Sequence, residues 1–277
     1  MKQVVTVSEI RSARAALSSP VGFVPTMGYL HPGHLSLVKR AREECANVVV
    51  SIFVNPTQFG PQEDLQTYPG DIARDLALLA EELIDLVWIP KQEDMYPAGY
   101  QTWVTVEDVA QRLEGAYRPG HFRGVATVVA KLLNCVQPDK TYFGQKDAQQ
   151  VIVIRRMVQD LNIPGEIIVC PTVREPDGLA MSSRNSYLDV EERRAAGILF
   201  RALTEAQSAY QMGEKDSDSL RQMMAKIIQS EPLARLQYVS CADPDSLVEL
   251  EGIVQRALLS MAVFIGKTRL IDNLMLG

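Results

Sequence analysis

The sequence predicts an α/β protein with a parallel sheet that is covered by helices on both faces, followed by a smaller α+β unit. Short apolar segments alternate with amphipathic helical patterns through the first 170 residues, as expected of β-α-β units. Residues 48–54 form an apolar, β-branched run, which is typical of a strand buried on both faces. After Pro171 the pattern changes to two helices and then three strands, which indicates a second unit.

The elements of the first unit follow from apolar spacing and from glycine and proline stops. Strands are expected over residues 21–24, 48–54, 86–89, 141–143 and 166–170, with a further edge strand over 102–106. Helices are expected over residues 33–45, 71–83, 125–136 and 147–160, and loops over 56–70 and 114–124. In the helix over 71–83, Ile72, Leu76 and Leu79 form the expected buried stripe.

The second unit follows a polar loop over residues 172–185. Helices are expected over residues 190–211 and 217–229, and strands over 236–241, 258–264 and 268–271. We therefore predict two domains, residues 1–176 and residues 177–277, with the polar loop at their junction.

Composition excludes several classes of protein. The 277 residues are 47% hydrophobic and carry a formal net charge of −6, so the chain can bury a large core but is a poor general partner for nucleic acid. The four cysteines form no Cys-x-x-Cys pair, and free buried thiols in a reducing compartment are expected. The first 17 residues lack the apolar centre of a signal peptide, and no apolar run is long enough to span a membrane. We expect a soluble, cytoplasmic protein.

Two of the three histidines lie in one tetrapeptide, His31-Pro32-Gly33-His34, just after the first apolar strand. A helix that begins there presents unpaired backbone N–H groups and a partial positive charge at the carboxyl end of the sheet, which favours phosphate. Two imidazoles three residues apart share one face of the helix start and can donate to phosphate oxygens. A metal pair and two incidental histidines are the alternatives, and the metal interpretation lacks an obvious third ligand.

Three further segments supply groups that suit phosphate or a small polar substrate. Met181-Ser182-Ser183-Arg184 offers hydroxyls and a guanidinium, although alone it fits a polar linker better. Residues 143–147 follow a strand, and there Lys146 can pair with phosphate while Asp147 can either cap the next helix or accept from a ribose. Asn55, Gln58 and the amides of Gln149 and Gln150 should lie at the same edge of the sheet, either on substrate or on loop backbone. The basic loop over residues 118–124 fits an anionic pocket or a simple turn.

Five ordered segments together resemble the pantoate–β-alanine ligase family. They are residues 25–34, 51–59, 114–124, 143–150 and 177–185. The resemblance implies a Rossmann-like nucleotidyltransferase fold of the HIGH superfamily with a small C-terminal α+β lid domain, and a homodimer. It also implies a two-step reaction: pantoate and Mg-ATP give pantoyl adenylate and pyrophosphate, and β-alanine then gives pantothenate and AMP.

The resemblance implies a role for each matching residue. His34 is the catalytic acid or donor, and His31, Lys146 and Arg184 surround the same developing charge. ATP is contacted by Met27, Gly28, Tyr29, Leu30, His31, Pro32, Gly33, His34, Gly144, Gln145, Lys146, Asp147, Val173, Met181, Ser182, Ser183 and Arg184. Pantoate is bound by Gln58 and Gln150, with Gln58 also beside β-alanine, and Asn55 is a further candidate from its place at the strand end. No protein ligand for Mg²⁺ is assigned, because the phosphates of ATP can supply most of its shell.

Two other functions share some of these features. A nucleotidyltransferase that keeps the nucleotide on its product uses the same His-x-Gly-His element, and a nucleotide-binding regulatory module would need no turnover. A tRNA-charging role is disfavoured, because the chain is short and acidic and has no evident anticodon-binding unit.

Overall fold

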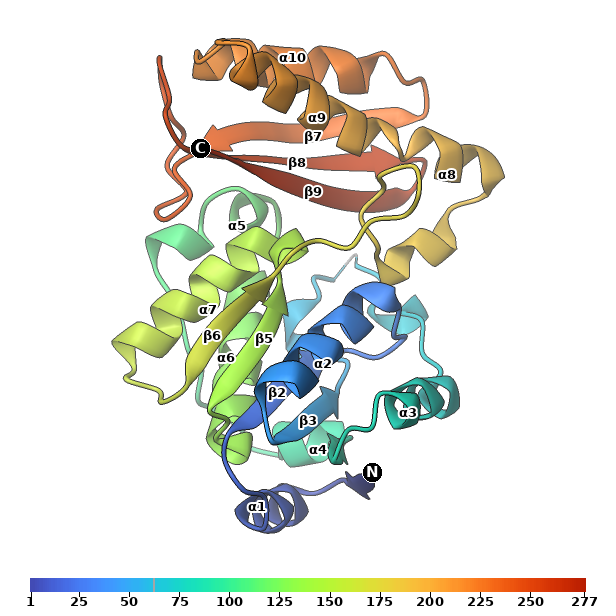
Figure 1. Ribbon diagram of the computed structural model, residues 1–277, viewed down its shortest axis with the longest axis vertical. Coiled ribbons are helices and arrows are strands. Elements are labelled where there is room, and N and C mark those ends of the chain that lie inside the picture. The colour runs from blue at the N-terminus through green and yellow to red at the C-terminus, as the bar shows by residue number, and fades with distance from the viewer. Residues whose placement is uncertain (62) are drawn as a thin grey trace.

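The computed structural model describes residues 1–61 and 63–277, which form two sheets stacked end to end (Figure 1). The predicted loop over 56–70 includes residue 62, which lies outside the described residues. All pairings in the larger sheet are parallel, and its spatial order is β1-β4-β3-β2-β5-β6. Its strands are β1 (Lys2–Val4), β2 (Val21–Thr26), β3 (Asn47–Ile52), β4 (Leu86–Trp88), β5 (Lys140–Gly144) and β6 (Glu166–Cys170).

Helices cover both faces of this sheet, because successive strand residues point to opposite sides. Val21 and Phe23 pack into one apolar cluster with α1, α6 and α7, whereas Val24 packs into another with α2 and α3. The helices are α1 (Val7–Ala15), α2 (Pro32–Glu44), α3 (Ile72–Glu81), α4 (Gln92–Met95), α5 (Glu114–Tyr117), α6 (His121–Val136) and α7 (Ala148–Asp160). The predicted doubly covered parallel sheet is confirmed.

The strand order places the switch point of the sheet at β2. The chain runs from β2 to β3 and β4 on one side, then returns to place β5 and β6 on the other. Ligands of open α/β sheets bind beyond the carboxyl ends of the strands at such a point. The structure therefore directs attention to the segments that follow Thr26 and Gly144.

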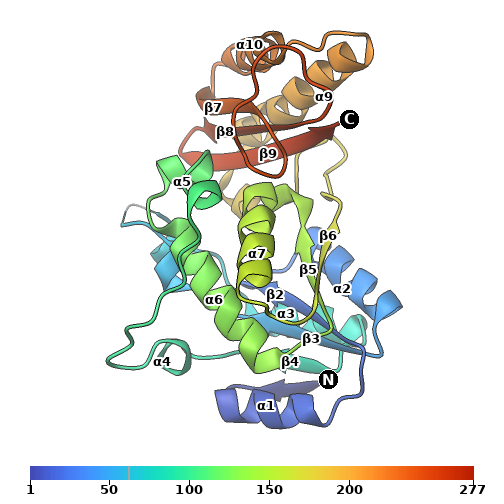
Figure 2. The same cartoon turned by 90° about the vertical axis from the view of Figure 1, so that its left-hand side faces the viewer.

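The second sheet is antiparallel, in the order β7-β8-β9. Its elements are α8 (Val190–Ala195), α9 (Ile198–Gln211), α10 (Ser217–Gln229), β7 (Ala234–Ala242), β8 (Ala257–Ile265) and β9 (Thr268–Leu276). Helices α9 and α10 cover the face away from the parallel sheet and share an apolar cluster with the strands. Strand β9 lies directly above α5 and α7 (Figure 2), so this smaller unit lies over the carboxyl ends of the larger sheet.

The predicted edge strand over residues 102–106 is wrong. Among the described residues this segment pairs with no strand, and the Val104 N–H donates instead to the Thr127 hydroxyl of α6 at 3.0 Å. The edge position beside β4 belongs to β1, which is too short, at three residues, to show an apolar period.

Three other predictions differ from the structure in their details. The loop over 114–124 holds α5 and the first turn of α6, where Gly124 marks close packing: a Cβ there would lie 2.3 Å from the Thr57 carbonyl oxygen. The helix over 190–211 divides into α8 and α9 next to Gly197, a poor helix former. In α3, Ile72 is 43% exposed and Asp75 is fully buried instead.

The four cysteines are all free and buried, as expected from their spacing. Among the described residues, no helix combines the length and the apolar character needed to cross a bilayer.

Candidate active site

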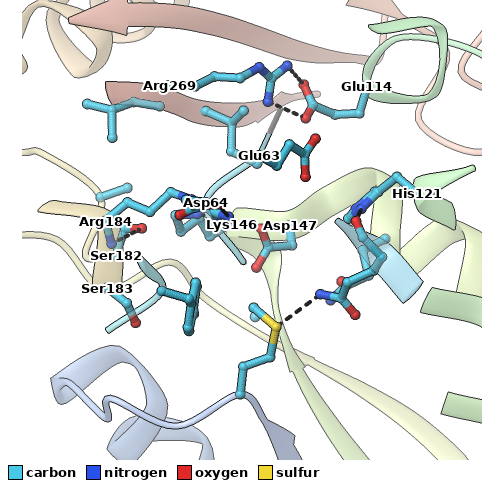
Figure 3. Close-up of a pocket in the computed structure, with 18 of the residues that line it drawn as sticks. Glu63, Asp64, Glu114, His121, Lys146, Asp147, Ser182, Ser183, Arg184 and Arg269 are labelled. Carbon is cyan, nitrogen blue, oxygen red and sulfur yellow. Dashed lines mark hydrogen bonds and ion pairs between the residues drawn. The ribbon is translucent and has the colours of Figure 1, made fainter. Parts of the chain in front are cut away.

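A cavity of about 1460 Å³ lies between the two sheets, above the carboxyl ends of β2, β3 and β5 (Figure 3). The predicted site residues that line it are Met27, His31, Gly33, His34, Asn55, Gln58, Gly144, Lys146, Asp147, Gln150, Val173, Met181, Ser182, Ser183 and Arg184. The remaining ones, which belong to the same backbone segments behind this wall, are Gly28, Tyr29, Leu30, Pro32 and Gln145. Five segments that are far apart in the chain thus meet at one cavity.

The two histidines of the first motif cap α2 in a reciprocal way. The Gly33 N–H donates to His31 Nδ1 at 3.1 Å, and the His31 N–H donates to His34 Nδ1 at 3.4 Å. Because both Nδ1 atoms accept, each neutral ring carries its proton on Nε2. The ring centroids are 4.0 Å apart, so the motif presents two adjacent Nε2–H donors.

Both imidazoles are neutral near pH 7. Burial, together with the nearby charge of Lys146, lowers the pKa of His31 to about 4. Burial, together with His31, lowers the pKa of His34 to about 3. These rings are therefore suited to donate hydrogen bonds to a developing negative charge rather than to start as imidazolium acids.

The backbone that leads into the first motif is held by a buried carboxylate. Gly28 and Tyr29 have positive φ angles of 84° and 50°, and this turn is fixed from α3. Asp75 accepts from the Tyr29 N–H and from the Leu30 N–H, each at 2.7 Å. The sequence signal for this role was a charged residue on the expected apolar face of α3.

We expect Asp75→Asn to destabilise the fold and to weaken nucleotide binding. The amide would turn a donor toward one of the two backbone N–H groups and leave that buried group unpaired, at a cost of about 1–3 kcal/mol. Urea unfolding and the KM for ATP measure the two effects.

Asp71→Asn in the same helix is the matched control. Asp71 caps α3 by accepting from the Arg74 N–H at 3.0 Å, and Asn caps helices about as well. Equal stability of the two variants would contradict the role assigned to Asp75.

The second motif touches the first. Residues Ser183–Tyr187 form a short 3-10 turn, η5, in which the Ser183 hydroxyl donates to the Tyr29 carbonyl at 3.3 Å. A Cβ on Gly33 would lie 3.7 Å from the Cβ of Met181. The junction loop therefore packs directly on the start of α2, and a bulkier residue at position 33 would first meet the His31 ring.

Arg184 pairs with an acidic residue that also lines the cavity. Its Nε and its second terminal nitrogen donate to the two carboxylate oxygens of Asp64 at 2.9 and 2.8 Å, and the Tyr187 hydroxyl donates to Asp64 at 3.1 Å. The guanidinium lies 5.6 Å from the centre of the Tyr68 ring. Burial opposes ionisation of Asp64, but Arg184 outweighs it and the pKa of Asp64 lies below its usual range.

Lys146 lies on the short turn η4 (Gln145–Asp147) between β5 and α7. Its ammonium is 3.5 Å from the Asp147 carboxylate, and both side chains line the cavity (Figure 3). Asp147 does not cap α7 through its side chain. Its carboxylate therefore remains directed toward Lys146.

Gln58 is oriented by Asn55 and His121. Its Oε1 accepts from Asn55 at 3.0 Å, and its Nε2 has only the Met27 sulfur as a partner among the described residues, at 3.1 Å. The Gln58 carbonyl accepts from His121 Nδ1 at 2.8 Å, so His121 Nε2 accepts from Arg118 at 3.1 Å. Burial, with the charge of Arg118, lowers the pKa of His121 to about 4.

Asn55 itself is fully engaged by the protein. It is 1% exposed, its Oδ1 accepts from the Tyr96 hydroxyl at 2.9 Å, and its Nδ2 also reaches the Gly124 carbonyl at 3.2 Å. These contacts favour a positioning role for Asn55, whereas Gln58 lines the cavity with its Nε2 on the Met27 sulfur.

Two carboxylates that the sequence did not single out complete the walls. Glu63 accepts from Arg118 at 2.7 Å in two hydrogen bonds. Glu114 accepts in the same way from Arg269 of β9 at 2.7 Å, as Figure 3 shows. These partners are 55 and 155 residues apart, so no local pattern connects them. Within the described ranges, no group of three or more His, Cys, Asp or Glu side chains could hold a metal ion.

The sequence profile of the pantoate-beta-alanine ligase family matches residues 2–275. The pantothenate synthetase of Roseiflexus sp. (strain RS-1) is 61% identical over 276 residues, which cover 100% of this chain and 99% of that protein. The crystal structure of pantothenate synthetase from Thermus thermophilus is 49% identical with a TM-score of 0.95, and 99% of each chain is covered. A pantoate-beta-alanine ligase from Francisella tularensis, complexed with beta-gamma ATP and beta-alanine, is 38% identical with a TM-score of 0.82 over 99% of this chain and 97% of its own. These full-length matches show that the chain belongs to the pantoate–β-alanine ligase family.

Proposed function

We propose that this chain joins pantoate to β-alanine in an ATP-dependent condensation that passes through pantoyl adenylate and releases pyrophosphate and AMP. The observation that carries the proposal is that one cavity joins the two histidines, the Ser-Ser-Arg turn, Lys146 and Gln58. Its volume of about 1460 Å³ accommodates a nucleotide together with a small acid. Family membership and the ligands of the Francisella tularensis relative support the same reaction.

In the first step, the pantoate carboxylate attacks the α-phosphate and pyrophosphate leaves. Negative charge then grows on the phosphate oxygens, where neutral donors and cations stabilise it. His31 and His34 would donate from Nε2, while Lys146 and Arg184 would supply positive charge from the opposite walls. His31 and His34 are already held by backbone hydrogen bonds, so these two donors need little reorganisation during the reaction.

In the second step, the amine of β-alanine attacks the acyl carbon of the adenylate and AMP leaves. A free carboxylate is a poor acyl donor, because it would have to expel an oxide anion. In the acyl adenylate the leaving group is AMP, which departs readily. The Gln58 amide would hold pantoate and β-alanine together, and Gln150, which also lines the cavity, would bind pantoate as well. No covalent enzyme intermediate is required.

We further propose Mg²⁺ as the companion of ATP. A Mg²⁺ ion on nucleotide phosphates needs only one or two carboxylates besides phosphate and water, and the carboxylate of Asp147 lines the cavity beside Lys146. When bound, the ion would neutralise phosphate charge. The residues that line the cavity are therefore compatible with a Mg²⁺ ion whose ligands come mainly from the phosphates of ATP and from water.

We also propose that residues 1–176 and 177–277 act as two domains that close over ATP, in a cytoplasmic homodimer. The site draws on both sides of that boundary, which supports closure by the smaller unit. The free, buried cysteines suit a reducing compartment. The dimer rests on the resemblance to the family.

A coupled assay of AMP release tests the reaction. With ATP, pantoate and β-alanine present, we expect AMP release that stops when any one of the three is omitted. Exchange of pyrophosphate into ATP should require pantoate and no β-alanine. Exchange without an acid, or a nucleotide retained on the final product, would favour a nucleotidyltransferase, and the absence of AMP would favour a binding module.

A further inference from the structure

Strand β9 of the smaller unit contacts three segments that carry pocket residues. Asp272 accepts from both terminal nitrogens of Arg174 at 2.6 and 3.0 Å, next to the junction loop. Arg269 pairs with Glu114, and Asn273 contacts the turn that carries Lys146. Of these contacts, the one at Asn273 acts most directly on a predicted phosphate ligand.

Asn273 fastens the η4 turn through both ends of its amide. Its Nδ2 donates to the Gln145 carbonyl at 3.0 Å and to the Lys146 carbonyl at 2.8 Å. Its Oδ1 accepts from the Gln145 side chain at 3.1 Å. The side chain is buried, with Asn273 5% exposed, so water competes little for these bonds.

The turn that Asn273 contacts also borders a small pocket. A void of about 50 Å³ lies there, lined by Lys146, Asn273 and Ser260 among others. The Ser260 hydroxyl is buried and makes no hydrogen bond within the described part of the chain. The turn thus borders a pocket near Asn273, and the hydrogen bonds from the Asn273 amide hold the backbone carbonyls of the turn there.

We infer that Asn273, on β9 of the smaller sheet, is a positioning residue that holds Lys146 in place to bind the phosphates of ATP. It does not line the large cavity, so it acts through the turn and not by touching the nucleotide. The inference rests on the proposed function insofar as Lys146 binds ATP phosphates. Only an amide meets the geometry, because the turn offers two carbonyl acceptors and one amide donor.

Asn273→Asp tests the inference with a nearly isosteric change. A carboxylate would face two carbonyl oxygens and repel the turn, so we expect the KM for ATP to rise at least about tenfold and kcat to fall. The KM values for pantoate and β-alanine should change much less. Asn162→Asp is the matched control, because it adds the same charge at an exposed turn outside the cavity, and its kinetics should equal those of the wild type.

A double-variant comparison separates positioning from general structural damage. If Asn273 acts through Lys146, then Asn273→Asp should add little to the loss already caused by Lys146→Ala. Effects that multiply, or equal rises in all three KM values, would overturn the inference. Should Asn273→Asp fail to fold, Asn273→Ala removes the same hydrogen bonds without repulsion and carries the same expectations.

Direct binding of a non-hydrolysable ATP analogue keeps this test separate from the proposed reaction. Calorimetry on the full chain should show weaker binding to Asn273→Asp than to Asn162→Asp, whether or not AMP is released. If the wild type releases no AMP, the proposed ligase fails while the affinities still decide the role of Asn273. If the wild type is an active ligase and both variants bind the analogue equally, only the inference fails.

Discussion

Replacing His34 with alanine should lower kcat at least about a hundredfold, because one well-placed donor to a developing oxyanion contributes roughly that much. His34 Nδ1 is occupied by the His31 N–H, so its Nε2–H is the donor that remains for phosphate. The imidazole is neutral at pH 7, since burial and His31 lower its pKa to about 3. Steady-state AMP release under saturating substrates measures the loss.

His34→Gln serves as the conservative comparison. Its amide can present an N–H donor on a side chain of similar length, so we expect it to recover part of the lost rate. The alanine variant should still fold, with only a modest decrease in its free energy of unfolding, since His34 also accepts one backbone hydrogen bond at the start of α2. Turnover near that of the wild type in His34→Ala would contradict a catalytic role.

Replacing Arg184 with alanine should lower kcat/KM for ATP by roughly a hundredfold or more, the range found when a preorganised charge on a phosphate is removed. Arg184 is held by Asp64 in the structure, at 2.8 Å, and phosphates would compete for the same guanidinium. Without Arg184, the Asp64 carboxylate faces the nucleotide unneutralised. The double variant Arg184→Ala/Asp64→Asn should therefore be more active than Arg184→Ala alone.

Arg193→Ala provides the matched control for that charge. Arg193 donates to Asp177 at 3.0 Å in a similar arginine–aspartate pair, but both residues lie outside the cavity lining. Pairs in contact with solvent contribute little, so we expect kinetics close to those of the wild type. Similar losses in Arg184→Ala and Arg193→Ala would show that the effect comes from loosening the junction and not from lost phosphate binding.

The elements with strong apolar patterns could be predicted from the sequence, because the spacing of apolar residues within each element shows which of its faces is buried. The run Val48–Val54 and the helices that flank it have spacings that are typical of a sheet covered on both faces. Strand β1 was not predicted, because its three residues are too few to show an alternation of apolar and polar side chains. Gly124 contributed to the wrong prediction of a loop over residues 114–124, because glycine occurs both in loops and at close contacts between elements. Here it allows α6 to approach Thr57.

The candidate site also contains residues that could be predicted from the sequence and residues that could not. The residues whose groups we propose for phosphate binding lie in short motifs, so the local sequence indicates them. The residues that hold those groups do not, because their partners are distant in the chain: Asp64 and Arg184 are 120 residues apart. Asp75 alone left a local signal, as a carboxylate on an otherwise apolar helix face.

The contact between Asn273 and the Lys146 turn also has a consequence for how the protein is made. The two residues are 127 positions apart, and β9 follows every other segment of the site in chain order. During synthesis the parallel sheet is able to form long before its last polar support exists. On the proposed role of Asn273, a nascent chain carries the histidine motif and the lysine turn early, but it completes the proposed phosphate site only after β9 has left the ribosome.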